Sequence, residues 1–338
     1  MTTESDNFAY SPVPKAAERL FRMCWQLENW LRTIVYVELR AQRVDWETPI
    51  RRKVQDWPPR PLSSDKRLHH MATSHHMAIS YLTFSQLWDI ISSDESWELF
   101  APYLPPKENV SVKIAEIKTI RNRTAHFRDP HPKDTARLEL FMDDMEPGIR
   151  RFCNRYTQGQ IQSDSSHDPV STALKNIWED VGYGIELMYP HGWLYAPGHH
   201  RMEPLMNGRL DILTHQNYSH HSLEGIVYRV TVHRGNRNAR YSDTVQLFDR
   251  TRSLHNDIIH FLISSFGDEV SITVPAILGV ERTTELVSAF LRAGLEACCG
   301  FAKSVDIGKL DWPEYVMWPN HMLNIFCDEI QEPILVLE

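Results

Sequence analysis

Apolar residues recur three and four positions apart in four segments of the first 157 residues. This spacing places the apolar side chains on one face of a helix, so each segment predicts an amphipathic helix. Residues 44–61 contain four prolines and predict a connector between the first two helices. The predicted helices cover residues 15–41, 65–92, 108–125 and 134–156. The sequence therefore predicts an all-α four-helix bundle over residues 1–157.

The pattern changes after this bundle. Residues 158–169 are rich in Gln, Ser and Asp and predict a linker. Beyond the linker, β-branched and aromatic runs predict strands, and longer periodic segments predict helices. Strands are expected at residues 183–195, 209–214, 225–233, 269–278 and 333–337, and helices at 242–265 and 283–303. The predicted fold class is α plus α/β, with the bundle followed by a mixed α/β domain over residues 170–338.

The composition and charge of the chain indicate what kind of partner it is expected to bind. The chain has 338 residues, of which 42% are hydrophobic and 24% charged, as in an ordinary globular protein. Residues 1–157 hold 23 basic and 21 acidic side chains, a balance of +2, whereas the remainder holds 13 and 23, a balance of −10. We expect an anionic partner to contact the first part through a local basic patch.

Several classes of protein are disfavoured by the sequence. No apolar run approaches the ~20 residues that cross a bilayer, and the first residues lack the basic and apolar regions of a secretory signal. The five cysteines show no Cys-x-x-Cys spacing, which argues against a disulfide framework or a zinc ribbon. Nucleotide-binding glycine motifs are also missing. We expect a cytoplasmic protein with no membrane partner, no metal and no cofactor.

The densest group of chemically active residues lies at the end of the third predicted helix. Arg121-Asn122-Arg123-Thr-Ala-His126-Phe-Arg128 places three arginines and one histidine within eight residues. An imidazole can exchange protons with a ribose 2′-OH and a leaving 5′-oxygen, and a guanidinium can hold the phosphate between them. The segment predicts metal-free RNA cleavage by Arg121 and His126. Asn122, one helical turn before His126, would assist, and Arg123 and Arg128 would hold flanking phosphates.

The Arg-x4-His spacing is not diagnostic by itself. It occurs again at Arg250 and His255, also within a predicted helix. The neighbours of His255 are Leu254, Ile258 and Leu262, which predict a histidine at the edge of a core. An arginine-rich helix end can also be a solvated face, with the histidine favouring the helix dipole. The position of the first copy, late in the third helix of a bundle, distinguishes it from the second.

This motif and the order of the helices resemble the HEPN superfamily, whose four-helix bundles carry Arg-x4–6-His late in the third helix, often as Arg-Asn. The resemblance covers about residues 15–157. It implies a metal-independent endoribonuclease of the kind found in toxin–antitoxin, abortive-infection and CRISPR systems of antiviral defence. Arg121 and His126 take the catalytic roles and Asn122 the supporting one. Glu28 matches the polar residue of the first helix that is aimed at the cleft.

The resemblance also implies partners. Two bundles would pair into a homodimer with one composite cleft, and the substrate would be RNA, such as tRNA or structured RNA. The acidic second domain would sense a trigger, bind an antitoxin or restrain the nuclease. Position 128 is arginine where the nucleotidyltransferase-paired branch has a tyrosine, so neutralisation by tyrosine adenylylation is not expected.

Two other functions stay open. The bundle could be a non-catalytic HEPN-like module for dimerisation and RNA binding, or the α/β domain could hold a separate enzyme activity. Adjacent histidine pairs point away from each other on a helix and do not predict a metal site. Four tryptophans near predicted loops could stack on a base or a partner. They are Trp97, Trp193, Trp312 and Trp318.

Overall fold

The structure is a computed structural model that describes residues 13–53, 77–157, 168–180, 184–188, 191–195, 206–213, 223–234, 241–263, 269–299 and 315–317. By their contacts the residues fall into two compact units. The first comprises residues 1–32 and 83–149, and the second comprises residues 33–82 and 150–338. Most of the predicted linker, residues 158–167, and the predicted strand at 333–337 lie outside the described residues.

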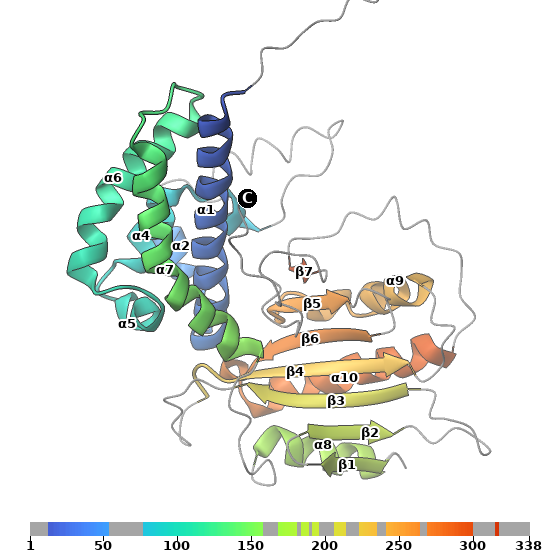
Figure 1. Ribbon diagram of the computed structural model, residues 1–338. Helices are drawn as coiled ribbons and strands as arrows, with labels where there is room; N and C mark the ends of the chain where they lie inside the picture. Colours follow the sequence, from blue (N-terminus) through green and yellow to red (C-terminus); the bar gives the residue numbers. More distant parts are fainter. Residues whose placement is uncertain are drawn as a thin grey trace, which may run out of the picture. The chain divides into compact units, whose positions relative to one another are not determined.

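The first unit is helical (Figure 1). Its long helices are α1 (Lys15–Gln42), α6 (Lys107–Ala125) and α7 (Asp134–Thr157); α1 belongs to this unit up to residue 32 and α7 up to residue 149. The shorter elements are α4 (Phe84–Ile91), α5 (Trp97–Phe100) and the 3-10 turn η2 (Ala101–Tyr103). The predicted helical N-terminal region is confirmed, and both ends of each long helix fall within one residue of their predicted positions.

Burial of apolar side chains explains why α6 is a helix. Val110, Ile114, Ile117 and Ile120 are buried on one face, whereas Val112 on the opposite face is exposed. Burial of each aliphatic side chain contributes about 1.5–3 kcal/mol to folding. Packing of this apolar face therefore stabilises α6 more than the helix propensity of its residues does. The same spacing therefore fixes which face of α6 remains available to solvent and to ligands.

The prediction of one continuous helix over residues 65–92 is wrong in its described part, residues 77–92. The 3-10 turn η1 (Ala78–Tyr81) comes first, and α4 starts after Thr83. The Thr83 hydroxyl accepts from the Gln86 amide at 3.3 Å, and the Gln86 side chain accepts from the Thr83 amide at 2.9 Å. This capping box satisfies two backbone donors and starts a new helix at a place where the apolar spacing alone shows no break.

The predicted connector at residues 44–61 contains a short helix, α2 (Thr48–Lys53), which the sequence analysis did not predict. Pro49 lies in its first turn, where the missing amide hydrogen costs nothing because no helical partner exists there. The prolines of residues 44–61 predict a connector without a helix, whereas Pro49 lies in the first turn of α2. Residues 54–61 lie outside the described residues.

The second unit contains a sheet. Within the described residues it has seven strands in the order β1-β2-β3-β4-β6-β5-β7. Neighbouring strands are antiparallel except for β5 and β7, which are parallel. The strands are β1 (Gly184–Met188), β2 (His191–Tyr195), β3 (Met206–Leu213), β4 (Val227–Arg234), β5 (His260–Ile263), β6 (Glu269–Pro275) and β7 (Val316–Met317).

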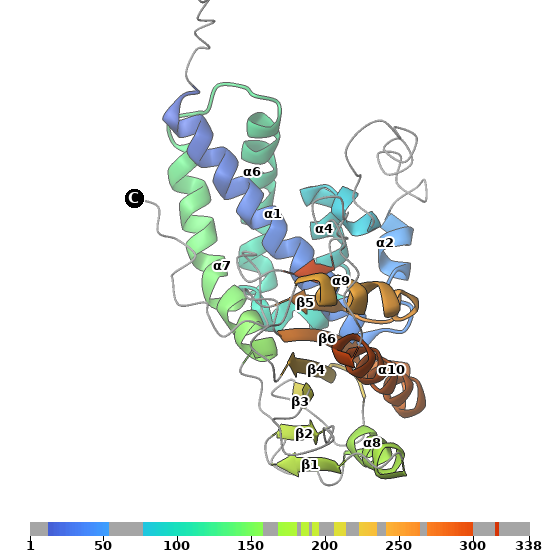
Figure 2. The same cartoon turned by 90° about the vertical axis from the view of Figure 1, so that its right-hand side faces the viewer.

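Three helices accompany the sheet: α8 (Pro169–Asp180), α9 (Tyr241–Arg250) and α10 (Val280–Cys299). Helix α10 packs against β3, β4 and β6 and also against α8 and α9. Figure 2 shows α8 and α10 on the same side of the sheet. The predicted mixed α/β part is therefore confirmed, with α8 and α10 on one face of the sheet.

Several predicted elements of the second unit are wrong in detail. The single strand predicted over residues 183–195 is wrong, because β1 and β2 are separate strands that pair antiparallel. Residues 242–265 are not one helix, because α9 ends at Arg250 and residues 260–263 form strand β5. All four residues of β5 are buried, and a short apolar run of this kind does not distinguish a strand from a helix. Helix α8 was not predicted.

The C-terminal half of α1 belongs to the second unit. The Tyr36 hydroxyl donates to the Ile259 carbonyl at 2.7 Å. The buried Arg40 guanidinium donates to the carbonyls of Asn256 and Ile258 and lies over the Trp46 ring, 5.0 Å from its centroid. These bonds fix the residues that lead into β5, because their carbonyl oxygens would otherwise be buried without donors.

His255 confirms the prediction of a histidine at the edge of a core. Its Nε2 lies 3.0 Å from the Thr251 hydroxyl and its Nδ1 lies 3.0 Å from the Tyr315 hydroxyl. The Thr251 hydroxyl already donates to the Leu247 carbonyl at 2.8 Å, so it accepts from Nε2, and Nδ1 accepts from Tyr315. Burial, assisted by the nearby Arg252 charge, lowers the pKa of His255 to about 4. The ring is therefore neutral.

This histidine makes stability depend on pH. Below pH 6.5 the unfolded chain binds a proton at position 255 that the folded chain does not bind until about pH 4. As the pH falls through this range, His255 therefore lowers the free energy of unfolding by about 1.4 kcal/mol per pH unit. We expect His255→Gln, which keeps a neutral hydrogen-bonding side chain, to show a flatter dependence in urea titrations at pH 7.5, 6 and 5. Parallel curves for the two proteins would contradict this assignment.

Gly148 in α7 allows a close approach of two backbones in the first unit. A Cβ atom at this position would lie 1.8 Å from the Tyr103 carbonyl oxygen of η2, which is backbone and cannot rotate away. We expect Gly148→Ala to lower the free energy of unfolding by at least about 2 kcal/mol, measured by urea denaturation. The matched control is Asp143→Ala on the exposed face of the same helix, which should stay within about 0.5 kcal/mol. Equal effects of the two changes would rule out the steric explanation.

Candidate functional site

The predicted catalytic segment forms the C-terminal end of α6. His126 is the residue that caps this helix, and its amide donates to the Asn122 carbonyl at 3.2 Å. The Phe127 amide donates to Thr124 and the Arg128 amide donates to Arg123, at 3.0 and 3.1 Å. This pair of bonds is a Schellman motif, which satisfies the last carbonyl groups of a helix.

Phe127 occupies an unusual position in this motif. The residue after the cap must adopt a left-handed backbone, and Phe127 has a φ of 52°. Glycine is usual there, because a side chain in this conformation costs roughly 1–2 kcal/mol. The Phe127 ring is also 90% exposed, so burial does not offset that cost. The chain thus holds a strained, exposed aromatic residue directly after His126.

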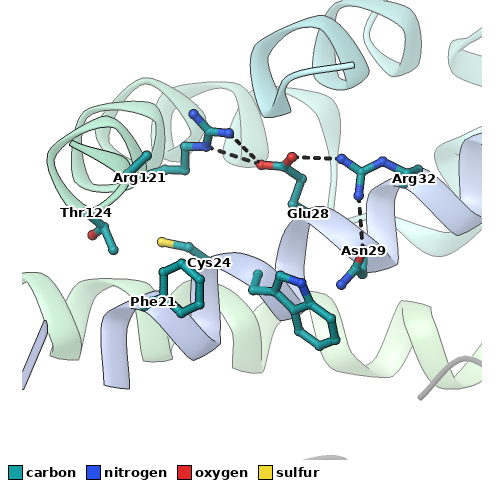
Figure 3. A pocket seen from close by; sticks show the side chains of 9 residues that line it. Phe21, Cys24, Glu28, Asn29, Arg32, Arg121 and Thr124 are labelled. Carbon is teal, nitrogen blue, oxygen red and sulfur yellow. Dashed lines mark hydrogen bonds and ion pairs between the residues drawn. The ribbon is translucent and has the colours of Figure 1, made fainter. Parts of the chain in front are cut away.

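Arg121 is held by a glutamate of α1. Its Nε and Nη2 donate to the same oxygen of Glu28, Oε2, at 3.2 and 3.0 Å. The other oxygen of Glu28, Oε1, accepts from Arg32 Nη2 at 2.8 Å, and Arg32 Nη1 donates to Asn29 at 3.0 Å. Figure 3 shows this row of side chains from Arg121 through Glu28 and Arg32 to Asn29. One carboxylate thus lies between two guanidiniums, and the three groups sum to one positive charge.

A pocket of about 160 Å³ lies beside this row, between α1 and α6. Residues of α1 and of the last turn of α6 line it. The lining residues are Phe21, Cys24, Trp25, Glu28, Asn29, Arg32, Arg121, Thr124 and Ala125. The pocket therefore joins a positively charged wall to an aromatic one.

Cys24 on the pocket wall is a neutral thiol. Burial raises its pKa to about 11, while a hydrogen bond with Thr124 and the charge of Arg121 act in the opposite direction. A thiol with such a high pKa is a poor nucleophile at neutral pH, since the thiolate is the reactive form. Cys24 therefore serves as packing between the two helices.

Arg123 holds the end of α6 to the start of α7. Its guanidinium pairs with Asp134, a buried carboxylate that also accepts from the His131 amide at 2.9 Å. This contact fixes the turn between the two helices. Arg128 is exposed. Of the two arginines predicted to hold flanking phosphates, one is thus engaged in an ion pair and the other faces solvent.

The structure brings together some of the predicted site residues. Arg121 and Glu28, 93 positions apart in the sequence, are in direct contact. His126 and Asn122 are exposed and do not line the pocket of Arg121. Sequence reasoning missed Phe21, Trp25 and Arg32 as site residues. Their spacing of four and seven along α1 was a signal, because it places them one above another on a face that the apolar stripe leaves open.

Comparisons with models of protein families, with curated proteins and with solved structures found no match to this chain. In the part of the chain that the structure describes, no cluster of three or more His, Cys, Asp or Glu side chains could hold a metal ion. None of the described helices combines the length and the apolar character needed to span a bilayer.

The strain at Phe127 can be measured. We expect Phe127→Gly to raise the free energy of unfolding by about 1 kcal/mol, because glycine adopts the left-handed backbone without steric cost. Phe127→Ala removes the ring but keeps the strained backbone, so it should leave the stability within about 0.5 kcal/mol of the unmodified chain. Urea denaturation of the three proteins provides the comparison. A destabilised glycine variant would mean that the ring itself contributes to folding.

Proposed function

We propose that the first unit is a metal-independent endoribonuclease of the HEPN type. The observation that carries this proposal is the direct contact between Arg121 and Glu28 beside a pocket, with His126 exposed at the end of the same helix. A guanidinium held in place beside a pocket suits a phosphodiester, and an exposed histidine suits proton transfer. Arg121 and His126 lie at the C-terminal end of a long helix, α6, which is the position that the resemblance described above implies.

The reaction requires no group beyond those of the chain and the RNA. The ribose 2′-oxygen attacks the adjacent phosphorus, and the bond from phosphorus to the 5′-oxygen breaks. The 2′-hydroxyl loses its proton and the departing 5′-oxygen gains one, which leaves a 2′,3′-cyclic phosphate and a 5′-hydroxyl. In this proposal His126 transfers one of these protons and Arg121 stabilises charge on the phosphate oxygens.

A second copy of the chain is part of this proposal. His126 is exposed and does not line the pocket of its own Arg121. Pairing of two bundles would let the histidine of one copy approach the arginine of the other. The acidic second unit would control this nuclease by sensing a trigger or binding an antitoxin, as expected in a defence system.

The exposed position of His126 also favours a second candidate function. If the pocket binds RNA through Arg121 and Arg32 without any proton transfer, the bundle is a non-catalytic RNA-binding and dimerisation module. Phosphate contacts of this kind weaken steeply as salt rises. The two candidates differ in whether a cleavage product forms.

The test follows the cleavage of tRNA by the full chain in the presence of EDTA. We expect His126→Ala to reduce the rate at least ~100-fold, the usual contribution of a general acid or base. The matched control is His131→Ala, an exposed histidine five positions further on, which should cleave at the original rate. Undiminished cleavage by His126→Ala would end the catalytic assignment. RNA binding by the unmodified chain without any cyclic phosphate product would establish the binding module instead.

A further inference from the structure

Two large aromatic side chains on α1 remain exposed at the pocket. Phe21 is 53% and Trp25 is 52% exposed, and both line the pocket. They lie four residues apart, so they are neighbours on one face of the helix. The core face of α1 is a different one, since Leu20, Met23 and Leu27 are buried. Phe21 and Trp25 therefore do not belong to the core stripe of this helix, and packing within the unit does not explain them.

The aromatic face adjoins the charged row of the same pocket. Trp25 precedes Glu28 by three residues and Arg32 by seven, which continues the same face of α1. The guanidiniums of Arg121 and Arg32 lie on either side of Glu28 and line the same pocket as the two rings. A nucleotide offers the complementary pair, a flat aromatic base joined to an anionic phosphate that accepts hydrogen bonds from guanidiniums. An apolar protein segment would match the rings and offer no acceptor to the guanidiniums.

We propose that Phe21 and Trp25 form a nucleobase subsite that restricts this pocket to single-stranded RNA. Aromatic side chains stack on bases of every sequence, and only unpaired bases present a free face. In a duplex the bases are stacked on each other and cannot reach the rings. The phosphate next to the stacked base lies at the Arg121 and Arg32 end of the pocket. This inference rests on the proposed function, because it takes RNA as the ligand of the same pocket.

The experiment measures binding separately from cleavage. The probe is a short fluorescein-labelled oligouridylate with 2′-O-methyl riboses, which lacks the attacking hydroxyl, used alone and as a duplex with the complementary strand. Fluorescence anisotropy with the full chain gives the Kd for both. We expect Trp25→Ala to raise the Kd for the single strand roughly 5- to 150-fold, the range seen for the loss of one stacked base. Binding of the duplex should not change.

Two further variants complete the test. Trp25→Phe keeps an aromatic face and should restore most of the single-strand affinity, which separates stacking from a defect in folding. Leu140→Ala removes a side chain of similar exposure (58%) that does not line the pocket, and it should bind like the unmodified chain. An unchanged Kd for Trp25→Ala would overturn the subsite, as would equal losses for single strand and duplex. A Trp25→Ala variant that loses self-association but keeps its RNA affinity would assign this face to a second copy and overturn it too.

The outcome distinguishes this inference from the proposed function. If Trp25→Ala loses single-strand binding and the unmodified chain never yields a cyclic phosphate, the nuclease proposal fails and the base subsite stands. If the chain cleaves RNA through His126 while Trp25→Ala binds the probe normally, the nuclease stands and the subsite fails.

Discussion

The candidate site depends on one carboxylate. Glu28 accepts from Arg121 with one oxygen and from Arg32 with the other, and it thereby allows two guanidiniums to lie on one wall of a pocket. Without this carboxylate the two cations would repel each other at short range, in surroundings where water screens them poorly. With it, both guanidiniums are oriented on the wall of the pocket. A site of this kind is prepared for an anion before any anion arrives, which lowers the cost of binding.

Removing Arg121, Glu28 or Arg32 would have different consequences for the site. Loss of Arg121 or Arg32 would leave Glu28 with one cationic partner, so the carboxylate would still be compensated. Loss of Glu28 would remove the only acceptor that the described contacts give Arg121, whereas Arg32 would still donate to Asn29. Such asymmetry is general, because removing one partner of a buried interaction costs most when the group left behind is charged. Glu28 is thus the structural centre of the site even if it never contacts the substrate.

Long, strongly periodic helices could be predicted from the sequence, and shorter elements could not. The ends of α6 followed from the prolines on both sides of it, Pro105-Pro106 before it and Pro130 and Pro132 after it, and burial then confirmed its apolar face. The break before α4 was missed because Thr83 interrupts the helix by a local capping box that leaves the apolar spacing intact. Strand β5 was assigned to a helix because its four residues, His260 and three apolar ones, are all buried and show no alternation.

The candidate site was predicted in part for similar reasons. Arg121 was selected from its residue type and helix position, and Glu28 from the family resemblance, and the structure shows them in contact. The direction of His126 could not be foreseen, because it caps α6 and its side chain leaves the helical pattern there. The left-handed backbone of Phe127 could not be predicted either, since neither this residue nor its neighbours in the sequence is a glycine. These two features depend on how the helix ends, and the periodic spacing of apolar residues along the helix carries no information about its end.

The chain passes between the two units more than once, and this has a practical consequence. The first unit is built from residues 1–32 and 83–149, with the intervening 50 residues assigned to the second. No single cut in the chain can therefore separate the two units as intact pieces. A fragment that ends at residue 149 would carry Tyr36 and Arg40 without the carbonyl groups to which they donate. Neither unit is one continuous segment of the chain. Removing or exchanging either unit by a single cut would therefore disrupt both.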